Sequence, residues 1–347
     1  MSDMKRIWYA IVLAAVLVWT GLPAAGDVPA SAQVISLLNY NVAGLPRLFG
    51  NAAADVEANQ QAIGQILSEK EYDIVAVQED FGYHKALAAG LTGYPYTTNH
   101  SGGVPGGDGM NLWSQYPLYN ESRTAWETAY GIIEDGADEM TPKGILYTVV
   151  ELDDGVYLDF YNIHADAYGD AGSVAAREAQ YRQLAAIIKE NSAGRPVIVT
   201  GDFNISLHHE DSCGLWENFM EPLGLRDAWI DLYNQGDTTD FSRWEGSGEE
   251  WDSIEKFLYR SGGGVTLEPL SFAYTYICRE NGESLSDHPA AEASFSIMKT
   301  ESFQSYPGEL TVTEDRWFPR VWQIFTTVIG DLGRLFANLD ELIAYLK

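Results

Sequence analysis

The sequence predicts an α/β fold with several β-strands in a mixed sheet and helices packed outside it. Short apolar runs rich in β-branched and aromatic residues alternate with longer segments of helical periodicity. Two of the runs flank Asp153-Asp154-Gly155, a turn sequence typical of an antiparallel hairpin. Apolar residues make up 46% of the chain and charged residues 20%, which is enough for a substantial core.

The individual elements follow from the same periodicity. We expect strands at residues 34–41, 73–78, 111–114, 145–152, 156–164, 196–201 and 291–297. Helices are expected at residues 55–70 and 173–190, where apolar residues recur at helical spacing. Glycine-rich segments at 101–109 and 261–264 lack the strand and helix context of a phosphate-binding loop and predict surface loops.

Residues 1–32 have the pattern of a signal peptide. Lys5 and Arg6 precede an apolar run at 7–19, and Ala30-Ser31-Ala32 offers a small-x-small cleavage site. The pattern predicts an exported protein, secreted or at the cell surface, with an uncleaved N-terminal anchor as the alternative. In an exported chain Cys213 and Cys278 could form a disulfide, and two free thiols fit equally well.

Residues 299–347 form a segment distinct from the domain expected at residues 33–298. Apolar residues between 321 and 346 follow helical spacing, which predicts an amphipathic helical tail, as one helix or a pair. A helix at a membrane interface would carry a basic polar face, whereas here Asp331, Asp340 and Glu341 offset Arg334 and Lys347. We therefore expect the tail to pack on the domain or on a second copy.

The charge balance is strongly acidic. The chain has 21 Lys and Arg against 50 Asp and Glu, a net charge of −29, and no cluster of basic residues. Because duplex DNA is bound largely through neutralisation of its phosphates, nucleic acid is a disfavoured partner. No protein partner is evident from the sequence.

Polar residues stand where several of the predicted strands end. Ligand sites of α/β proteins lie beyond one end of the strands, so these residues could converge on one pocket. They are Asn41, Glu79, His164, Asp202 and Asn204, together with Asp287 and His288 just before the last strand.

These residue types suit the hydrolysis of a phosphate ester. Glu79 is a hard oxygen ligand of the kind that Mg²⁺ or Mn²⁺ prefers. Asp287 could orient His288 as the base that takes a proton from water. His164 could protonate the leaving oxygen or hydrogen-bond the phosphoryl oxygens, and the amides of Asn41 and Asn204 can hold anionic oxygens.

Five blocks in order resemble the endonuclease/exonuclease/phosphatase superfamily. The blocks are NYNVAGLP (39–46), DIVAVQE (73–79), NIH (162–164), TGDFN (200–204) and SDH (286–288). The resemblance implies the deoxyribonuclease-like fold, a four-layer sandwich of two mixed β-sheets flanked by helices. Weaker similarity lies in GMNLWSQYP (109–117) and in TPKG (141–144), which makes Lys143 a candidate substrate contact.

Carried over by position, the resemblance assigns roles to single residues. It makes Glu79 the principal metal ligand with Asn41 beside it, and Asp202 and Asn204 the groups that position water and phosphate. It puts His164 on the leaving-group side and makes Asp287 and His288 the source of the base. One block departs from the family, because SIEKFL (253–258) stands where many members have an Arg-Ile-Asp-Tyr-type strand. Glu255 occupies the place of that Asp, and its role is left open.

The opening block looks like that of neutral sphingomyelinases. Together with export, the acidic charge and the aromatic content of 12%, it favours a metal-dependent phosphodiesterase acting on a phospholipid head group at a membrane surface. The alternatives are a secreted nuclease, an inositol-phosphate phosphatase of the same superfamily, or a catalytically dead binding module. The presence of every main motif residue argues against the last.

Overall fold

The computed structural model describes residues 32–46, 53, 55–104, 106–131, 138, 141–207, 212, 214–240 and 254–312. The expected signal peptide, Cys213 and the apolar helical pattern of the tail lie outside these ranges. In the described part of the tail, residues 300–312 form turns and irregular structure with one isolated bridge, at Val312. Among the described helices, none is long and apolar enough to cross a membrane.

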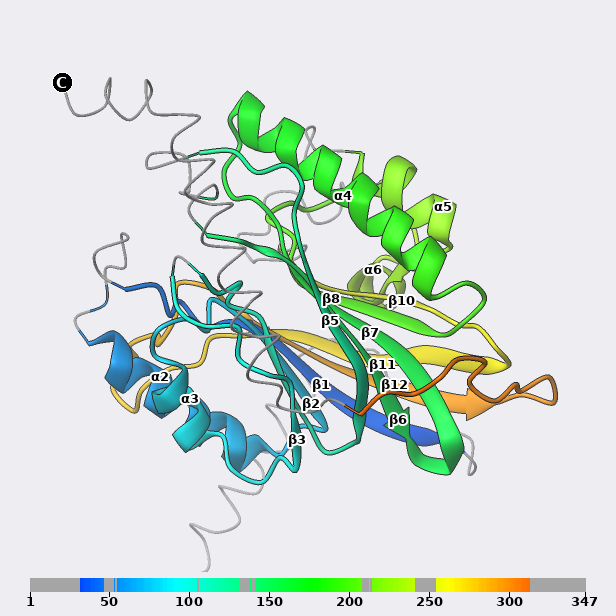
Figure 1. Ribbon diagram of the computed structural model, residues 1–347, viewed down its shortest axis with the longest axis horizontal. Coiled ribbons are helices and arrows are strands. Elements are labelled where there is room, and N and C mark those ends of the chain that lie inside the picture. Colours follow the sequence, from blue (N-terminus) through cyan, green and yellow to red (C-terminus); the bar gives the residue numbers. More distant parts are fainter. Residues whose placement is uncertain are drawn as a thin grey trace, which may run out of the picture.

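Two six-stranded sheets pack face to face (Figure 1). The first has the order β11-β12-β1-β2-β4-β3 and the second β5-β6-β7-β8-β10-β9. The strands of the first sheet are β1 (Gln33–Asn41), β2 (Ile74–Gln78), β3 (Tyr96–Thr97), β4 (Asn111–Ser114), β11 (Val265–Thr275) and β12 (Ala290–Lys299). Those of the second are β5 (Leu118–Ala125), β6 (Gly144–Leu152), β7 (Val156–His164), β8 (Val197–Asp202), β9 (Arg226–Asp227) and β10 (Glu255–Arg260).

Helices cover the outer face of each sheet (Figure 1). On the first sheet lie α2 (Val56–Lys70) and α3 (His84–Gly90), and on the second lie α4 (Ala171–Asn191), the π-helical turn η3 (Leu215–Met220) and α5 (Glu221–Leu223). The short α6 (Ala228–Tyr233) packs against β10 and β11. The Asp55 side chain caps α2 and that of Asp170 caps α4, each by accepting main-chain N–H bonds.

Three apolar clusters hold these layers together. One lies between the sheets and includes Leu37, Phe160 and Phe295, all almost fully buried. A second joins α2 and α3 to β1 and β2, and a third joins α4 to β6, β7 and β8. Because both faces of the central strands are covered, β2 and β8 are continuously buried, which explains their unbroken apolar runs.

The predicted fold class is confirmed: the chain forms a four-layer α/β sandwich with two mixed sheets. All seven expected strands and both expected helices are present, and Asp153–Gly155 (η2) joins β6 to β7 as an antiparallel pair. The periodicity did not predict the strands β5, β10 and β11, nor short elements such as β3, β9 and α3.

Polar side chains join the two sheets within the core. Gln78 Nε2 donates to Asn39 Oδ1 and to Asn162 Oδ1, both at 2.7 Å, and Asn39 Nδ2 donates to the Gly201 carbonyl at 3.0 Å. All three side chains are fully buried. Such a network fixes the position of one sheet against the other close to the strand ends.

Candidate active site

The strand directions bring six strand ends to one edge of the sandwich. β1 and β2 run parallel, as do β7 and β8, so the last residues of these strands lie at the same edge. β10 is antiparallel to β8 and begins at Glu255 opposite Asp202, while β12 is antiparallel to β1 and begins just after His288. The structure thereby collects residues that are up to 247 positions apart in the chain.

Asn41 links the two sheets at the centre of this edge. Its amide nitrogen donates to Glu79 Oε1 at 3.2 Å and to Asp202 Oδ2 at 3.1 Å, and lies 3.5 Å from His288 Nε2. Its amide oxygen accepts the N–H of Ala43 at 3.1 Å. Asn41 lies beside Glu79, as expected, and presents its amide nitrogen to that carboxylate.

Glu79 lies on a tightly constrained turn after β2. Its φ is +59°, in the left-handed region that costs free energy for a residue with a side chain. The carbonyl of Glu79 lies only 2.3 Å from where a Cβ on Gly44 would be, so the two loops meet at a point that only glycine allows. Burial raises the pKa of the Glu79 carboxyl, and the charges of Lys143 and His288 act in the opposite direction.

His288 is paired with Glu255. Its Nδ1 lies 2.5 Å from Glu255 Oε1 and 3.9 Å from Asp202 Oδ2. Burial acts to lower the pKa of His288, but the hydrogen bond to Glu255 and the charge of Asp202 outweigh it and raise the pKa to about 10. Asp287 does not take the orienting place expected for it: its side chain is 81% exposed, and its nearest oxygen lies 4.0 Å from Nε2.

His164 lies deeper in the site than His288. Its Nε2 is 3.5 Å from Asp202 Oδ2, and its Nδ1 is buried with no hydrogen-bond partner among the described residues. Burial lowers the pKa of His164 well below its usual range, and the positive charges of Lys143 and His288 add to the effect. The imidazole is therefore neutral at physiological pH.

Asn204 follows Asp202 in a left-handed turn, with φ of +52°. Asp202 Oδ1 accepts the main-chain N–H of Asn204 at 2.9 Å, and Asn204 Nδ2 donates to the Ala165 carbonyl at 2.9 Å. This turn explains the Gly-Asp-Phe-Asn spacing, since Asn tolerates left-handed backbone better than most side chains. Burial raises the pKa of Asp202, and the nearby Glu255 carboxylate adds to the rise.

Lys143 reaches the site from the segment before β6 and forms a buried ion pair with Asp138. Its charge also acts on Glu79 and Asp166. The sequence did not indicate Asp138 as a site residue, because it belongs to an acidic stretch. Glu255 was indicated by the block at 253–258, which differs from the family pattern.

The donor set suits a hard divalent cation. Glu79, Asp202 and Glu255 bring three carboxylates to one edge of the sandwich, and Lys143 and His288 are the cations that interact with them there among the described residues. Oxygen donors of this kind are those that Mg²⁺ and Mn²⁺ prefer. Asp202, Glu255 and His288 also present ligand atoms within 4.8 Å of one another.

Comparison with known proteins identifies relatives of this chain. The endonuclease/exonuclease/phosphatase family model matches residues 38–288. A sphingomyelinase from Mycobacterium tuberculosis is 34% identical over 268 residues, covering 75% of this chain and 52% of that protein. This chain thus spans about half the length of the curated mycobacterial relatives that it matches.

Solved structures share the fold at low identity. Sphingomyelinase C from Streptomyces griseocarneus has a TM-score of 0.51 and 18% identity, over 76% of this chain and 99% of that one. A beta toxin variant from Staphylococcus aureus, solved with bound magnesium ions, has a TM-score of 0.54 and 16% identity, over 75% and 99%. With the family match, these similarities confirm the resemblance carried by the five motif blocks.

Proposed function

This chain belongs to the endonuclease/exonuclease/phosphatase family, and from that premise we propose that it is a metal-dependent phosphodiesterase that releases the head group of a sphingomyelin-type phospholipid. One observation carries the proposal: Asn41, Glu79, His164, Asp202 and His288 come from both sheets and meet at one edge. The proposal includes export of the chain, on the signal-peptide pattern of residues 1–32.

Glu79 would be the principal ligand of Mg²⁺ or Mn²⁺, with Asn41 beside it. The fit rests on the oxygen donors and on the burial of Glu79, which raises the pKa of its carboxyl. A divalent cation would balance the buried negative charge. When bound, the ion would neutralise phosphoryl charge and stabilise the charge that develops during hydrolysis. In the structure Asn41 holds Glu79 through its NH₂ group, so it would act first by fixing the carboxylate.

His288 would take the proton of the attacking water. The water oxygen bonds to phosphorus while one of its protons passes to the imidazole, and the bond from phosphorus to the lipid oxygen breaks. The lipid oxygen leaves with the bonding electron pair and takes up a proton from solvent. Glu255 stabilises the imidazolium that forms, because its carboxylate lies 2.5 Å from Nδ1. A divalent cation near Glu79 would lower the pKa of His288 by repulsion, which leaves more of the neutral base before each turnover.

The neutral state of His164 favours one of its two expected roles. An imidazole whose pKa is well below the usual value is rarely protonated, so it is a poor source of a proton for the leaving oxygen. A neutral ring can still donate one N–H bond, which suits a phosphoryl oxygen. Asp202 and Asn204 would position water and phosphate from the adjacent turn, and Lys143 would contribute positive charge to the substrate.

The substrate class rests on the mycobacterial relatives, which are named as sphingomyelinases. Two properties of this chain support a lipid over nucleic acid. The net charge of −29 repels a polyanion, and Arg123 is bound by Asp108 and Glu121 instead of facing a ligand. A choline head group, which is cationic, suits an acidic protein surface.

The test is phosphocholine release from sphingomyelin vesicles by the purified full chain. Parallel reactions contain phosphatidylcholine vesicles, inositol phosphates or plasmid DNA, each with Mg²⁺ or with EDTA. We expect release from sphingomyelin with Mg²⁺ only, its loss in Glu79→Gln, and its retention in Glu69→Gln, which changes an exposed carboxylate on α2.

Three other outcomes would contradict the proposal in different ways. Cleavage of DNA alone would overturn the lipid assignment while keeping the hydrolase. Activity that survives both EDTA and Glu79→Gln would overturn the metal-dependent mechanism. A properly folded chain that cleaves none of the substrates would overturn the proposed activity.

A further inference from the structure

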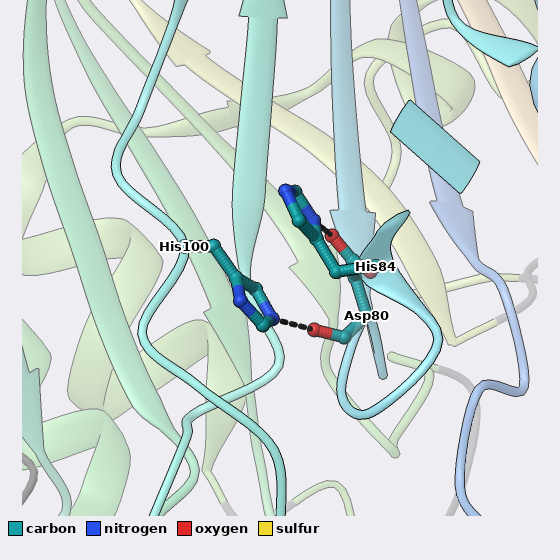
Figure 2. Close-up of side chains that lie close together, drawn as sticks. All are labelled: Asp80, His84 and His100. Carbon is teal, nitrogen blue, oxygen red and sulfur yellow. Dashed lines mark hydrogen bonds and ion pairs between the residues drawn. The ribbon is translucent and has the colours of Figure 1, made fainter. Parts of the chain in front are cut away.

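We propose that Asp80, His84 and His100 form a second metal site, selective for a Zn²⁺-like transition-metal ion, that shares no residue with the catalytic site, although Asp80 directly follows Glu79. Asp80 and His84 flank the loop that leads into α3, and His100 comes from the segment between β3 and β4. One ligand atom from each residue lies within 4.8 Å of those of the other two. Figure 2 shows both rings turned toward Asp80.

The three side chains are already held in contact. His84 Nδ1 lies 2.6 Å from Asp80 Oδ2, and His100 Nε2 lies 3.1 Å from the Asp80 carbonyl oxygen. The two imidazole rings stack with centroids 4.0 Å apart and planes within 8°. Because an imidazole nitrogen binds a metal in the plane of its ring, one ring must turn out of this stack for both to bind one ion. Trp113 stacks next to His84, with centroids 5.9 Å apart.

Asp80 carries the observation that points to a ligand. Its side chain is only 1% exposed, yet Oδ1 has no hydrogen-bond partner among the described residues. The other oxygen, Oδ2, accepts a bond from Asn111 Nδ2 at 2.7 Å. A buried carboxylate oxygen without a partner is costly, and a cation beside it would remove that cost. Asn111 acts as the outer partner that orients a metal-binding carboxylate.

The surrounding charges allow a cation here. Arg123 is a positive group whose charge acts on His100, and its guanidinium donates to both oxygens of Asp108 at 2.7 and 2.8 Å and to Glu121 at 3.2 Å. Two carboxylates therefore pair with this guanidinium, and the ion pair of Asp80 is with His84. The His84 side chain is 23% exposed, which gives an ion access from solvent.

The ligand types determine which ion binds. Two imidazoles and one carboxylate suit Zn²⁺ and related transition metals, with a water completing the coordination, whereas Mg²⁺ prefers oxygen ligands. The edge of the sandwich that carries Glu79, Asp202 and His288, here called the catalytic edge, is richer in oxygen donors. Zn²⁺ should therefore bind at Asp80, His84 and His100 even when Mg²⁺ is present in excess.

The experiment is a calorimetric titration of Zn²⁺ into the full chain, purified without a polyhistidine tag, stripped with EDTA and kept in excess Mg²⁺. We expect one Zn²⁺ equivalent to bind at least about 100-fold more weakly in His84→Asn and in His100→Gln. His288→Asn is the matched control, because it removes a histidine of the catalytic edge and should leave this Zn²⁺ equivalent in place. Zn²⁺ should also raise the Tm of the wild type and of His288→Asn by about 5 °C at 100 times Kd.

Unchanged Zn²⁺ binding in His84→Asn and His100→Gln would overturn the proposal and leave the cluster as a structural contact of the loop. Loss of the bound Zn²⁺ equivalent in His288→Asn alone would show that Zn²⁺ binds at the catalytic edge, and this would also overturn the proposal. Should the variants not fold, anomalous diffraction at the zinc edge from wild-type crystals gives the same answer. A peak between Asp80, His84 and His100 supports the site, and its absence there rejects it.

Discussion

His288 Nδ1 lies 2.5 Å from Oε1 of Glu255, the first residue of β10, while the neighbouring Asp287 points its side chain mostly into solvent. The partner of this imidazole is therefore supplied by the second sheet and not by the adjacent residue. Because Glu255 is fully buried within a strand, it fixes the orientation of the ring more rigidly than an exposed side chain could.

Replacing Glu255 with Gln should lower the pKa of His288. The hydrogen bond to Glu255 is the largest influence that raises this pKa to about 10 in the metal-free protein, and Gln removes the negative charge while keeping the shape. A titration of the ring nitrogens by NMR, in EDTA, measures the change. Asp287→Asn is the control and should shift the pKa less; an equal or larger shift would make Asp287 the main partner.

The same pair should make stability depend on pH. A histidine whose folded pKa lies above its unfolded value stabilises the fold fully below about pH 6.5, and that contribution is lost as pH rises through about 10. The wild type should therefore exceed Glu255→Gln in Tm near pH 6, and the difference should shrink toward pH 10. A difference that stays constant across this range, measured by calorimetry in EDTA, contradicts the linkage.

The site residues at strand ends could be predicted because they end or follow buried apolar runs, which can be recognised in the sequence alone. Asn41, Glu79, His164 and Asp202 each end or directly follow such a run. The hydrogen-bond partner of His288 could not be predicted in this way, because the choice between Glu255 and Asp287 depends on how β10 is paired with β8. Asp138 lies outside the predicted elements. Asp80, His84 and His100 come from the turn after β2, the start of α3 and the segment before β4, for which strand periodicity carries no information.

Glu79→Gln should abolish activity and yet stabilise the metal-free protein. The raised pKa of Glu79 means that its charged form is disfavoured in the fold, so the carboxylate destabilises the protein increasingly as pH rises from its unfolded value through its folded one. Gln removes this cost, and we expect kcat/KM to fall at least about 100-fold and Tm in EDTA at pH 7 to rise by about 2–4 °C. Thermal unfolding and substrate turnover are measured on the same preparation.

A decrease in Tm in EDTA would mean that the Glu79 carboxylate contributes to folding even without metal. Added Mg²⁺ gives the matching control, because it should raise the Tm of the wild type and leave that of Glu79→Gln unchanged.

The buried pair of Lys143 and Asp138 should be coupled in stability. Either single change, Lys143→Met or Asp138→Asn, leaves one group without its partner, and we expect a loss of about 3–5 kcal/mol in the free energy of unfolding. The double variant should lose much less than the sum of the single losses, because neither member of the pair is then left charged without the other. Denaturant unfolding of the four proteins measures the coupling, and additive losses would show that the pair does not act as a unit.

Gly44→Ala should reduce activity more than its cost in stability suggests. A Cβ at Gly44 would lie 2.3 Å from the carbonyl oxygen of Glu79, so the backbone that carries this carboxylate must move. A displacement of that kind should lower kcat/KM by about 10–100-fold, for about 1–3 kcal/mol of stability. The control is Gly82→Ala in the loop that carries Glu79, where an added Cβ meets nothing within 4 Å and activity should be unchanged. Equal effects of the two changes would mean that the loss of activity comes from stiffening of the loops in general. No effect of Gly44→Ala would show that activity tolerates a shift of the Glu79 backbone.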